Sequence, residues 1–481
     1  MNLAEALDIH AAARPDHPAV IAGDRAITHA ELAGTVRTTA GRLAAAGVAA
    51  GDVVGVCLKD TADHLFANFA LARLGAIILP MDWRWTTAEK RAVADHFGTR
   101  LVIAEADQAP LGTLRLSTLD ALPEAGPAPV ASPGGGETLP LLLSLSSGTT
   151  GRPKGPCITH HQMLRRFWTH WINLGLNSTD RYVSATPLYF GGGRTFAMSV
   201  LFAGGTVILF PPPFDAAGLS AELRRTRATS TFLVPTQLRK LLEAGDAERS
   251  ALGGLRLLIS SGAPLDPEER TAIASLCGNF IEYYASTEGG GISIATPQTR
   301  RTSPDSVGRP VFGVEIEIVS DDHVPLPRGS VGLLRYRGPG VATGYFREEA
   351  DDTAFRDGWF YPGDLAEIDD GGNVTLRGRR KDMIIRGGVN IYPAEIEQVL
   401  REHPSVADAA VVGRPSAKLG ETVAAFVVAR EPIDETALAA WCGARLAPYK
   451  VPDSFARVDE LPRNSAGKVL KAVLVERLAG N

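Results

Sequence analysis

The chain has 481 residues, of which 45% are hydrophobic and 21% are charged, and its formal net charge is −5. This composition predicts a well-packed globular protein of more than one domain and excludes a disordered chain. The mildly acidic balance excludes the basic footprint of a nucleic-acid or anionic-membrane binder.

The sequence shows no pattern typical of a segment that directs a protein out of the cytoplasm. Its first residues have neither the basic start nor the apolar core of a signal peptide, and no apolar run is long enough to span a bilayer. The four cysteines are far apart and form no CxxC pair, as is typical of reduced core residues. We therefore expect a cytoplasmic protein.

Short apolar runs alternate with amphipathic segments over the first 300 residues, a pattern that predicts layered α/β sheets. Buried parallel strands are expected at residues 53–58, 76–80, 101–106, 206–210, 231–235 and 255–260. Helices are expected at 88–97 and 220–227, and the proline- and glycine-rich segment 122–140 is expected to be a surface linker.

The pattern changes in the last third of the chain. From about Gly308 to Arg379, alternation with a period of two and glycine-rich turns predict antiparallel β structure. In the last hundred residues a helix is expected to begin at Pro393, strands to follow at 406–412 and 422–428, and an amphipathic helix to end the chain. These segments predict a small α+β unit.

The stretch LSLSSGTTGRPKG, residues 143–155, combines hydroxyl side chains, glycines and one lysine behind an apolar strand. Glycines let the backbone approach a ligand closely, and successive N–H groups and hydroxyls can cradle phosphate oxygens. Lys154 would add a positive charge, but it stands between Pro153 and Gly155, so the stretch is not a Walker A loop. Composition alone leaves open a phosphate loop of another kind and a plain surface turn.

The string SSGTTGRPKG resembles the signature of the adenylate-forming ligases, the superfamily that includes the acyl- and aryl-CoA synthetases. Further motifs are similar to those of the superfamily and follow in its order: SGAPL (261–265), YYASTE (283–288), GPGVATGY (338–345), GWFYPGDL (358–365), GRRKDMIIRGGVNIYPAEIE (378–397), APYKVP (447–452) and LPRNSAGK (461–468). The resemblance covers essentially the whole chain. It implies an α/β protein whose amino-terminal domain, residues 1–380, has layered sheets and a distorted β-barrel. A small mobile α+β domain, residues 381–481, would follow a hinge near Lys381.

The resemblance also implies an activity. An AMP-forming acid–CoA ligase uses ATP and Mg²⁺ to adenylate a carboxylic acid with release of pyrophosphate, and then transfers the acyl group to the thiol of coenzyme A. Three alternatives stay open: loading of a carrier-protein phosphopantetheine, an amine acceptor, and a non-catalytic nucleotide-binding regulator. The expected acid is small or medium in size, with aromatic and hydroxylated acids among the candidates. The sequence leaves open whether the protein is a monomer or a homodimer.

The implied nucleotide site draws on four motifs. The loop would hold the β- and γ-phosphates, Thr287 would contact the α-phosphate, and Glu288 would bind magnesium through carboxylate oxygen. Glu282 and Tyr284 would address the adenine, and Asp364 and Arg379 the ribose. The residues expected to bind ATP or AMP are Ser146, Ser147, Gly148, Thr149, Thr150, Gly151, Lys154, Gly262, Ala263, Pro264, Glu282, Tyr283, Tyr284, Asp364 and Arg379. A structural role for Glu282 and a plain turn at residues 262–264 remain alternatives.

Two elements of the last hundred residues are expected to serve the two half-reactions. Lys468 matches the superfamily's adenylation lysine, which would bridge the substrate carboxylate and the α-phosphate. Gly387 and Gly388 would leave room for the pantetheine arm after the domain has turned about Lys381. A simple hairpin turn is the alternative for the two glycines.

The resemblance implies an acid pocket near Trp168, Tyr189, Phe190, Arg194, Val234, Gly289 and Gly290. Phe190 stands where many members have histidine, and the glycines at 191–193 and 289–291 would provide space or flexibility. Arg194 has three interpretations, namely a partner for an anionic group of the acid, a solvent-facing helix residue, and a residue that faces phosphate.

Overall fold

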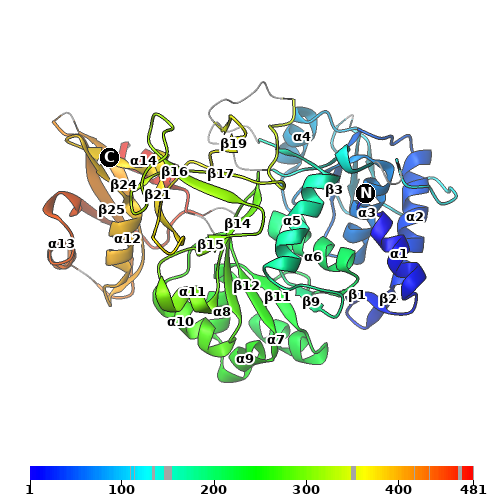
Figure 1. Cartoon of the computed structure of the whole chain (residues 1–481), viewed down its shortest axis with the longest axis horizontal. Coiled ribbons are helices and arrows are strands. Elements are labelled where there is room, and N and C mark those ends of the chain that lie inside the picture. The colour runs from blue at the N-terminus through cyan, green and yellow to red at the C-terminus, as the bar shows by residue number, and fades with distance from the viewer. Residues whose placement is uncertain are drawn as a thin grey trace.

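The computed structural model describes residues 1–108, 110–112, 114–132, 136–145, 154–347, 354–416, 418–432, 434–463 and 469–479. Four sheets and their helices form a large amino-terminal part and a smaller carboxyl-terminal domain, which lies at one end of the molecule (Figure 1). No helix in the described residues is long and apolar enough to cross a membrane.

Two mainly parallel sheets form the first part of the fold. The nine-stranded sheet has the order β15 (Arg309–Pro310), β14 (Gly290–Ala295), β13 (Phe280–Ser286), β12 (Leu257–Ser260), β11 (Ser230–Leu233), β9 (Arg181–Ser184), β10 (Thr206–Leu209), β1 (Pro18–Ala22) and β2 (Arg25–Thr28). The six-stranded sheet has the order β6 (Leu116–Ser117), β5 (Leu101–Ala104), β3 (Val53–Cys57), β4 (Ile77–Pro80), β7 (Pro140–Leu143) and β8 (Cys157–Thr159). Every run predicted as a buried parallel strand is one of these strands, within one or two residues at each end.

Helices cover both faces of these two sheets. They are α1 (Glu5–Ala13), α2 (His29–Ala45), α3 (Ala62–Leu74), α4 (Thr87–His96), α5 (His160–Ile172), α6 (Gly191–Ala203), α7 (Ala216–Arg225), α8 (Pro235–Glu243), α9 (Asp246–Ser250), α10 (Pro267–Leu276) and α11 (Pro297–Thr302), with the 3₁₀ turns η1 (Gly136–Thr138) and η2 (Ala251–Gly254). Alternate strand residues point to opposite faces, so Val54 packs in the core with α2, α3, α5 and α6, whereas Val53 packs beside α4. The four helices therefore lie between the sheets, as the α/β pattern predicts.

An antiparallel sheet follows, as expected from the alternation in the sequence. Its strands are β16 (Glu315–Val319), β17 (Gly332–Arg337), β18 (Phe355–Arg356), β19 (Trp359–Phe360), β20 (Asp364–Ile368) and β21 (Val374–Arg379). The 3₁₀ turn η3 (Arg380–Asp382) contains Lys381 and connects this sheet to the last one.

The carboxyl-terminal domain is an α+β unit with its own core. It contains β22 (Ile384–Arg386), β23 (Val389–Ile391), α12 (Pro393–Arg401), β24 (Val406–Ser416), β25 (Gly420–Ala429), α13 (Glu435–Gly443), η4 (Pro448–Lys450), β26 (Ser454–Arg457) and α14 (Lys471–Ala479). Ile384, Ile391, Ile396 and Leu400 are buried in one cluster, so the β22–β23 hairpin and α12 form one packed unit.

Candidate active site

Several of the predicted site residues lie at one edge of the nine-stranded sheet. Strands β9, β11, β12 and β13 run parallel, so their carboxyl ends share an edge. The segments that follow these strands contain Tyr189–Phe190, Val234, Gly262–Pro264 and Thr287–Glu288 respectively. Ligands of open α/β sheets bind at this kind of edge. The predicted loop residues Ser146, Ser147, Gly148, Thr149, Thr150 and Gly151, and Lys468, lie outside the described residues.

Asp364, Arg379 and Tyr284 form a polar cluster beside this edge. Asp364 and Arg379 are paired across β20 and β21, and the Arg379 Nε atom lies 2.7 Å from Asp364 Oδ1. The hydroxyl of Tyr284, from β13, donates a hydrogen bond to the other carboxylate oxygen of Asp364. Burial, followed by the charge of Asp364, raises the pKa of Tyr284, so the phenol stays a donor. Three residues predicted to bind the nucleoside are thus brought together.

Asp364→Asn should weaken ATP use while preserving the fold. The amide keeps the size of the carboxylate, but it offers one acceptor oxygen and replaces the other by a donor, which would face Tyr284 and the ribose hydroxyls. We expect the KM for ATP to rise about tenfold or more, because a lost charge-assisted contact costs about 1.5–3 kcal/mol. Steady-state kinetics over a range of ATP concentrations measures this. An unchanged KM would show that Asp364 does not contact the nucleotide.

Glu282 and Tyr283 do not join this cluster, because both have other partners. The carboxylate of Glu282 lies 2.8 Å from the Arg270 Nε atom and 3.3 Å from that of Arg300. These two ion pairs favour the structural role that the sequence left open. Tyr283 points to the opposite face of β13, where its hydroxyl lies 2.9 Å from Thr169 Oγ1 in the core between the sheets.

Glu288 is half-buried, and a phenol and a lysine lie nearby. Its Oε1 atom accepts a hydrogen bond of 3.3 Å from Tyr345, and the Nζ atom of Lys154 lies 4.7 Å from the centre of the Tyr345 ring. Burial is the main cause that raises the pKa of Glu288. A half-buried carboxylate that no cationic side chain among the described residues pairs with fits a hard divalent cation, and Thr287 lies next to it. Among the described residues no group of three acidic, histidine or cysteine side chains could hold a metal by itself.

Arg166 holds several segments of this region together, although no motif in the sequence indicates it. Its guanidinium is buried and donates to three carbonyl oxygens, those of Gly340 at 2.8 Å, Thr287 at 3.2 Å and Glu288 at 2.6 Å. Burial lowers its pKa to about 10, so it remains charged at neutral pH. Arg166 therefore ties α5 both to the Thr287–Glu288 turn and to the GPGVATGY segment.

Arg166→Met should lower the free energy of unfolding by about 3 kcal/mol, because three buried carbonyls lose their donor and each costs about 1 kcal/mol or more. Arg165→Met is the matched control, since Arg165 lies on a different face of α5, with its guanidinium 3.5 Å from the centre of the Trp168 ring. We expect the control to cost less than about 1 kcal/mol. Urea denaturation of both variants measures the difference, and equal losses would contradict the role given to Arg166.

Only some of the residues expected at the acid pocket line one cavity. Tyr189, Phe190 and Val234 line a cavity of about 280 Å³, and the basic residues Arg84 and Lys240 lie among its other lining residues. Trp168 does not line this cavity; it is half-buried and stacked on Arg165.

The glycines after Glu288 do not provide open space. The backbone at Gly289 lies against the hydroxyl of Tyr336, and the backbone at Gly290 lies against the side chain of Arg166. A side chain at either position would collide with these groups. In this structure the two glycines allow large neighbours to approach the turn.

Arg194 is buried, contrary to the solvent-facing interpretation. It is 1% exposed, and its Nη1 atom donates to the carbonyls of Leu188 at 3.3 Å and Tyr189 at 3.0 Å. No carboxylate pairs with it among the described residues. Burial lowers its pKa to about 9, and the nearby charge of Arg166 adds to the effect. Its contacts hold the segment that leads to Phe190.

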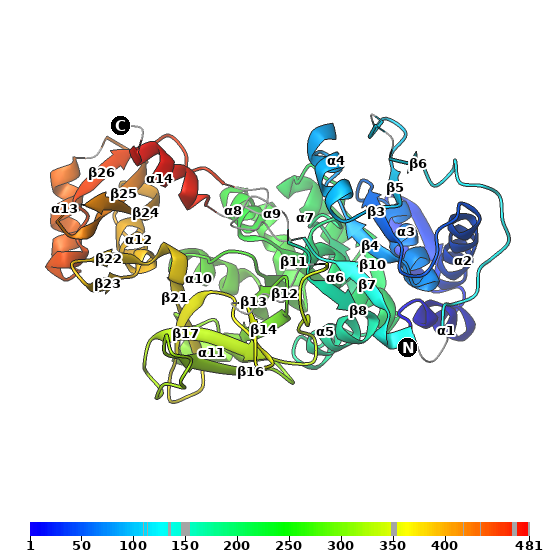
Figure 2. The same cartoon turned by 90° about the horizontal axis from the view of Figure 1, so that it is seen from above.

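The predicted pantetheine glycines are separated from this edge. Gly387 and Gly388 form the turn of the β22–β23 hairpin with φ angles of +57° and +83°, a conformation that favours glycine. In Figure 2 this hairpin lies on the outer side of the carboxyl-terminal domain, away from the amino-terminal sheets.

Comparison with known proteins matches two family models to the chain. The model of the AMP-binding enzymes covers residues 7–346, and that of the AMP-binding enzyme C-terminal domain covers residues 395–468. Over 98% of this chain and 97% of the relative, the sequence is 32% identical to indoleacetate–CoA ligase of Aromatoleum aromaticum.

Two solved structures of o-succinylbenzoate CoA synthetase from Bacillus subtilis are also similar. The complex with the acyl-adenylate intermediate has a TM-score of 0.89 at 28% identity and covers 98% of this chain and 97% of the other. A double mutant bound to its product analogue OSB-NCoA has a TM-score of only 0.73 at 29% identity, with 98% of each chain covered.

Proposed function

Because the chain belongs to the family of AMP-binding enzymes, we propose that it is an ATP-dependent carboxylic acid–CoA ligase. It adenylates a carboxylic acid, releases pyrophosphate, and transfers the acyl group to the thiol of coenzyme A. The observation that carries this proposal is the assembly of Asp364, Arg379 and Tyr284 beside Glu288, in a chain similar along its whole length to a CoA ligase.

In the first half-reaction, an oxygen of the acid attacks the α-phosphorus of ATP, and the bond to the β-phosphate breaks. Asp364 accepts hydrogen bonds from the ribose hydroxyls, and Arg379 holds Asp364 in place. Thr287 donates to the α-phosphate, and Lys154 offsets negative charge on the departing pyrophosphate. When bound at Glu288, magnesium neutralises phosphate charge. Arg166 holds the carbonyls of Thr287 and Glu288 and thereby fixes the turn that presents both side chains.

In the second half-reaction, the thiolate of coenzyme A attacks the acyl carbonyl, and AMP leaves. The resemblance assigns the Gly387–Gly388 hairpin to the passage for the pantetheine arm. In the present orientation the hairpin faces away from the site, so the carboxyl-terminal domain turns about η3 between the two steps.

The acid is of small or medium size and aromatic. The cavity of about 280 Å³ and its Tyr189 and Phe190 walls support this class, as does the similarity to enzymes named for indoleacetate and o-succinylbenzoate. Arg84 and Lys240 at the cavity suit acids that carry an additional polar group. Loading of a carrier protein uses the same pantetheine thiol and remains the alternative acceptor reaction.

Pyrophosphate release over a panel of acids tests the function. Purified protein with ATP and Mg²⁺ is assayed with aryl acids, short aliphatic acids and fatty acids, each with and without coenzyme A. We expect release that depends on an aryl acid, and turnover that rises when coenzyme A is added. The alternative acceptor would be favoured if a phosphopantetheinylated carrier protein, and not coenzyme A, accelerates pyrophosphate release with an aryl acid. ADP and phosphate as products would contradict the proposal.

A further inference from the structure

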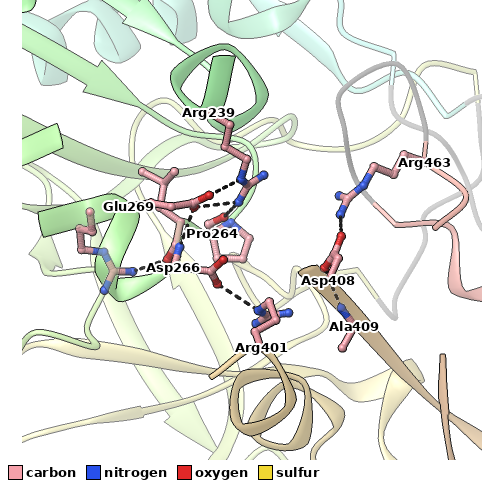
Figure 3. Close-up of polar contacts among 10 residues, drawn as sticks. Arg239, Pro264, Asp266, Glu269, Arg401, Asp408, Ala409 and Arg463 are labelled. Carbon is pink, nitrogen blue, oxygen red and sulfur yellow. Dashed lines mark hydrogen bonds and ion pairs between the residues drawn. The ribbon is translucent and has the colours of Figure 1, made fainter. Parts of the chain in front are cut away.

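An ion pair joins the two domains at a point outside the active site. The Nε atom of Arg401, the last residue of α12, lies 3.0 Å from Oδ1 of Asp266 in the amino-terminal part. Figure 3 shows the two side chains pointing toward each other across the gap between the domains. The Asp408–Arg463 pair, also drawn there, lies wholly within the carboxyl-terminal domain.

The amino-terminal side of this contact is fixed by its own hydrogen bonds. Asp266 is the N-cap residue of α10, and its backbone N–H donates to Glu269 Oε2 at 2.9 Å. Arg239 binds both carboxylate oxygens of Glu269, at 2.6 and 3.0 Å. Asp266 is therefore held in a preformed position directly after the SGAPL segment, part of which is expected to bind ATP or AMP.

The carboxyl-terminal side of the contact moves with the pantetheine hairpin. Arg401 ends the helix that packs in one core with β22 and β23, so any rotation that brings Gly387 and Gly388 to the site must also move Arg401. The hairpin now faces solvent, with Ile385 48% and Val389 42% exposed. The whole chain superposes better on the acyl-adenylate complex of the Bacillus subtilis enzyme than on its product-analogue complex.

We propose that the Asp266–Arg401 ion pair is a positioning contact that holds the carboxyl-terminal domain in its adenylating orientation. It forms in the orientation seen here and breaks when the domain turns, so it sets the balance between the two half-reactions. This inference rests on the proposed function. Neither residue is among those expected to bind the substrates; both act through the placement of the domain.

The effect should be modest and sensitive to salt. The side chains are 25% and 37% exposed, and partly exposed ion pairs shift an equilibrium by about two- to fivefold. Screening by salt weakens them further. Asp266→Asn is a suitable variant, because asparagine caps a helix as well as aspartate does and only the charge is lost. Arg401→Gln removes the charge from the other partner.

The test measures the two half-reactions separately at low and high salt. Each single variant should lower pyrophosphate release from acid and ATP by about two- to fivefold, while thioester formation from supplied acyl-adenylate stays equal or rises. The double variant should be no worse than either single variant, since both remove the same contact. The control Glu402→Gln, at an exposed neighbour of Arg401, should leave both rates unchanged. Equal losses in both half-reactions, or additive losses in the double variant, would overturn the proposal.

A second readout does not depend on finding the acid. Fluorophores are attached at Asp305→Cys and Glu431→Cys, both exposed and on different domains, in a Cys157→Ser background. Single-molecule energy transfer with ATP and Mg²⁺ then reports the domain orientations. Arg401→Gln should reduce the population of the wild type's main orientation relative to the others by the same two- to fivefold factor. Identical distributions would overturn the inference even in an active ligase, whereas a shift would support it even if no tested acid were adenylated.

Discussion

Lys468→Ala should lower the rate of acyl-adenylate formation by about two to three orders of magnitude. The ammonium group is expected to bridge the acid carboxylate and the α-phosphate while negative charge develops between them. Alanine removes that charge and adds no new contact. The assignment rests on the position of Lys468 in LPRNSAGK, which lies outside the described residues.

The two half-reactions separate this role from a general defect. Acyl-adenylate supplied directly should be converted to thioester by Lys468→Ala at nearly the wild-type rate, because that step develops its charge elsewhere. Rapid-quench measurement of both steps decides the question. Equal losses in both would show that the lysine supports the fold or the domain position and not the adenylation step.

Lys381→Pro should preserve adenylation and strongly reduce thioester formation. Lys381 is exposed in η3, the 3₁₀ turn between the two domains, and a 3₁₀ turn already has φ near the value of about −65° that proline imposes. Proline therefore fits the present orientation and resists a change of φ at the hinge. Because the hairpin of Gly387 and Gly388 faces away in that orientation, the pantetheine arm would lose its passage.

Lys381→Ala is the control for this substitution. Alanine removes the same side chain but restricts the backbone no more than lysine does, so both half-reactions should stay close to wild type. Wild-type rates of both steps in Lys381→Pro would mean that the hinge lies at another residue or that the domain need not turn. Loss of both steps, with loss of the folded state, would mean that proline is not tolerated in the turn.

Local patterns in the sequence predicted the main elements of the fold. The apolar runs at 53–58 and 101–106 are strands because β-branched residues suit a strand that is covered on both faces. The helix that begins at Pro393 follows from the fixed φ of proline and the spacing of its apolar residues. The motifs also indicated Asp364, Arg379 and Tyr284, which meet although 80 residues separate Tyr284 from Asp364.

Contacts between distant segments were less predictable. Glu282 is paired because Arg270 and Arg300 come from α10 and α11, and no local pattern indicates those partners. The glycines at 289 and 290 suggested space, but Tyr336 and Arg166 approach them from other elements. Arg166 and Arg194 resemble surface helix residues in the sequence, and only the packing of α5 and α6 between two sheets encloses them.

Transfer of an oxygen isotope tests the central claim most directly. An acid that supports pyrophosphate release is labelled with ¹⁸O in its carboxylate and incubated with the protein, ATP, Mg²⁺ and coenzyme A, and the AMP is analysed by mass spectrometry. If a carboxylate oxygen attacks the α-phosphorus, one ¹⁸O atom appears in AMP for each thioester formed, and none appears in pyrophosphate. Label in inorganic phosphate, with ADP as the nucleotide product, would contradict the adenylation mechanism.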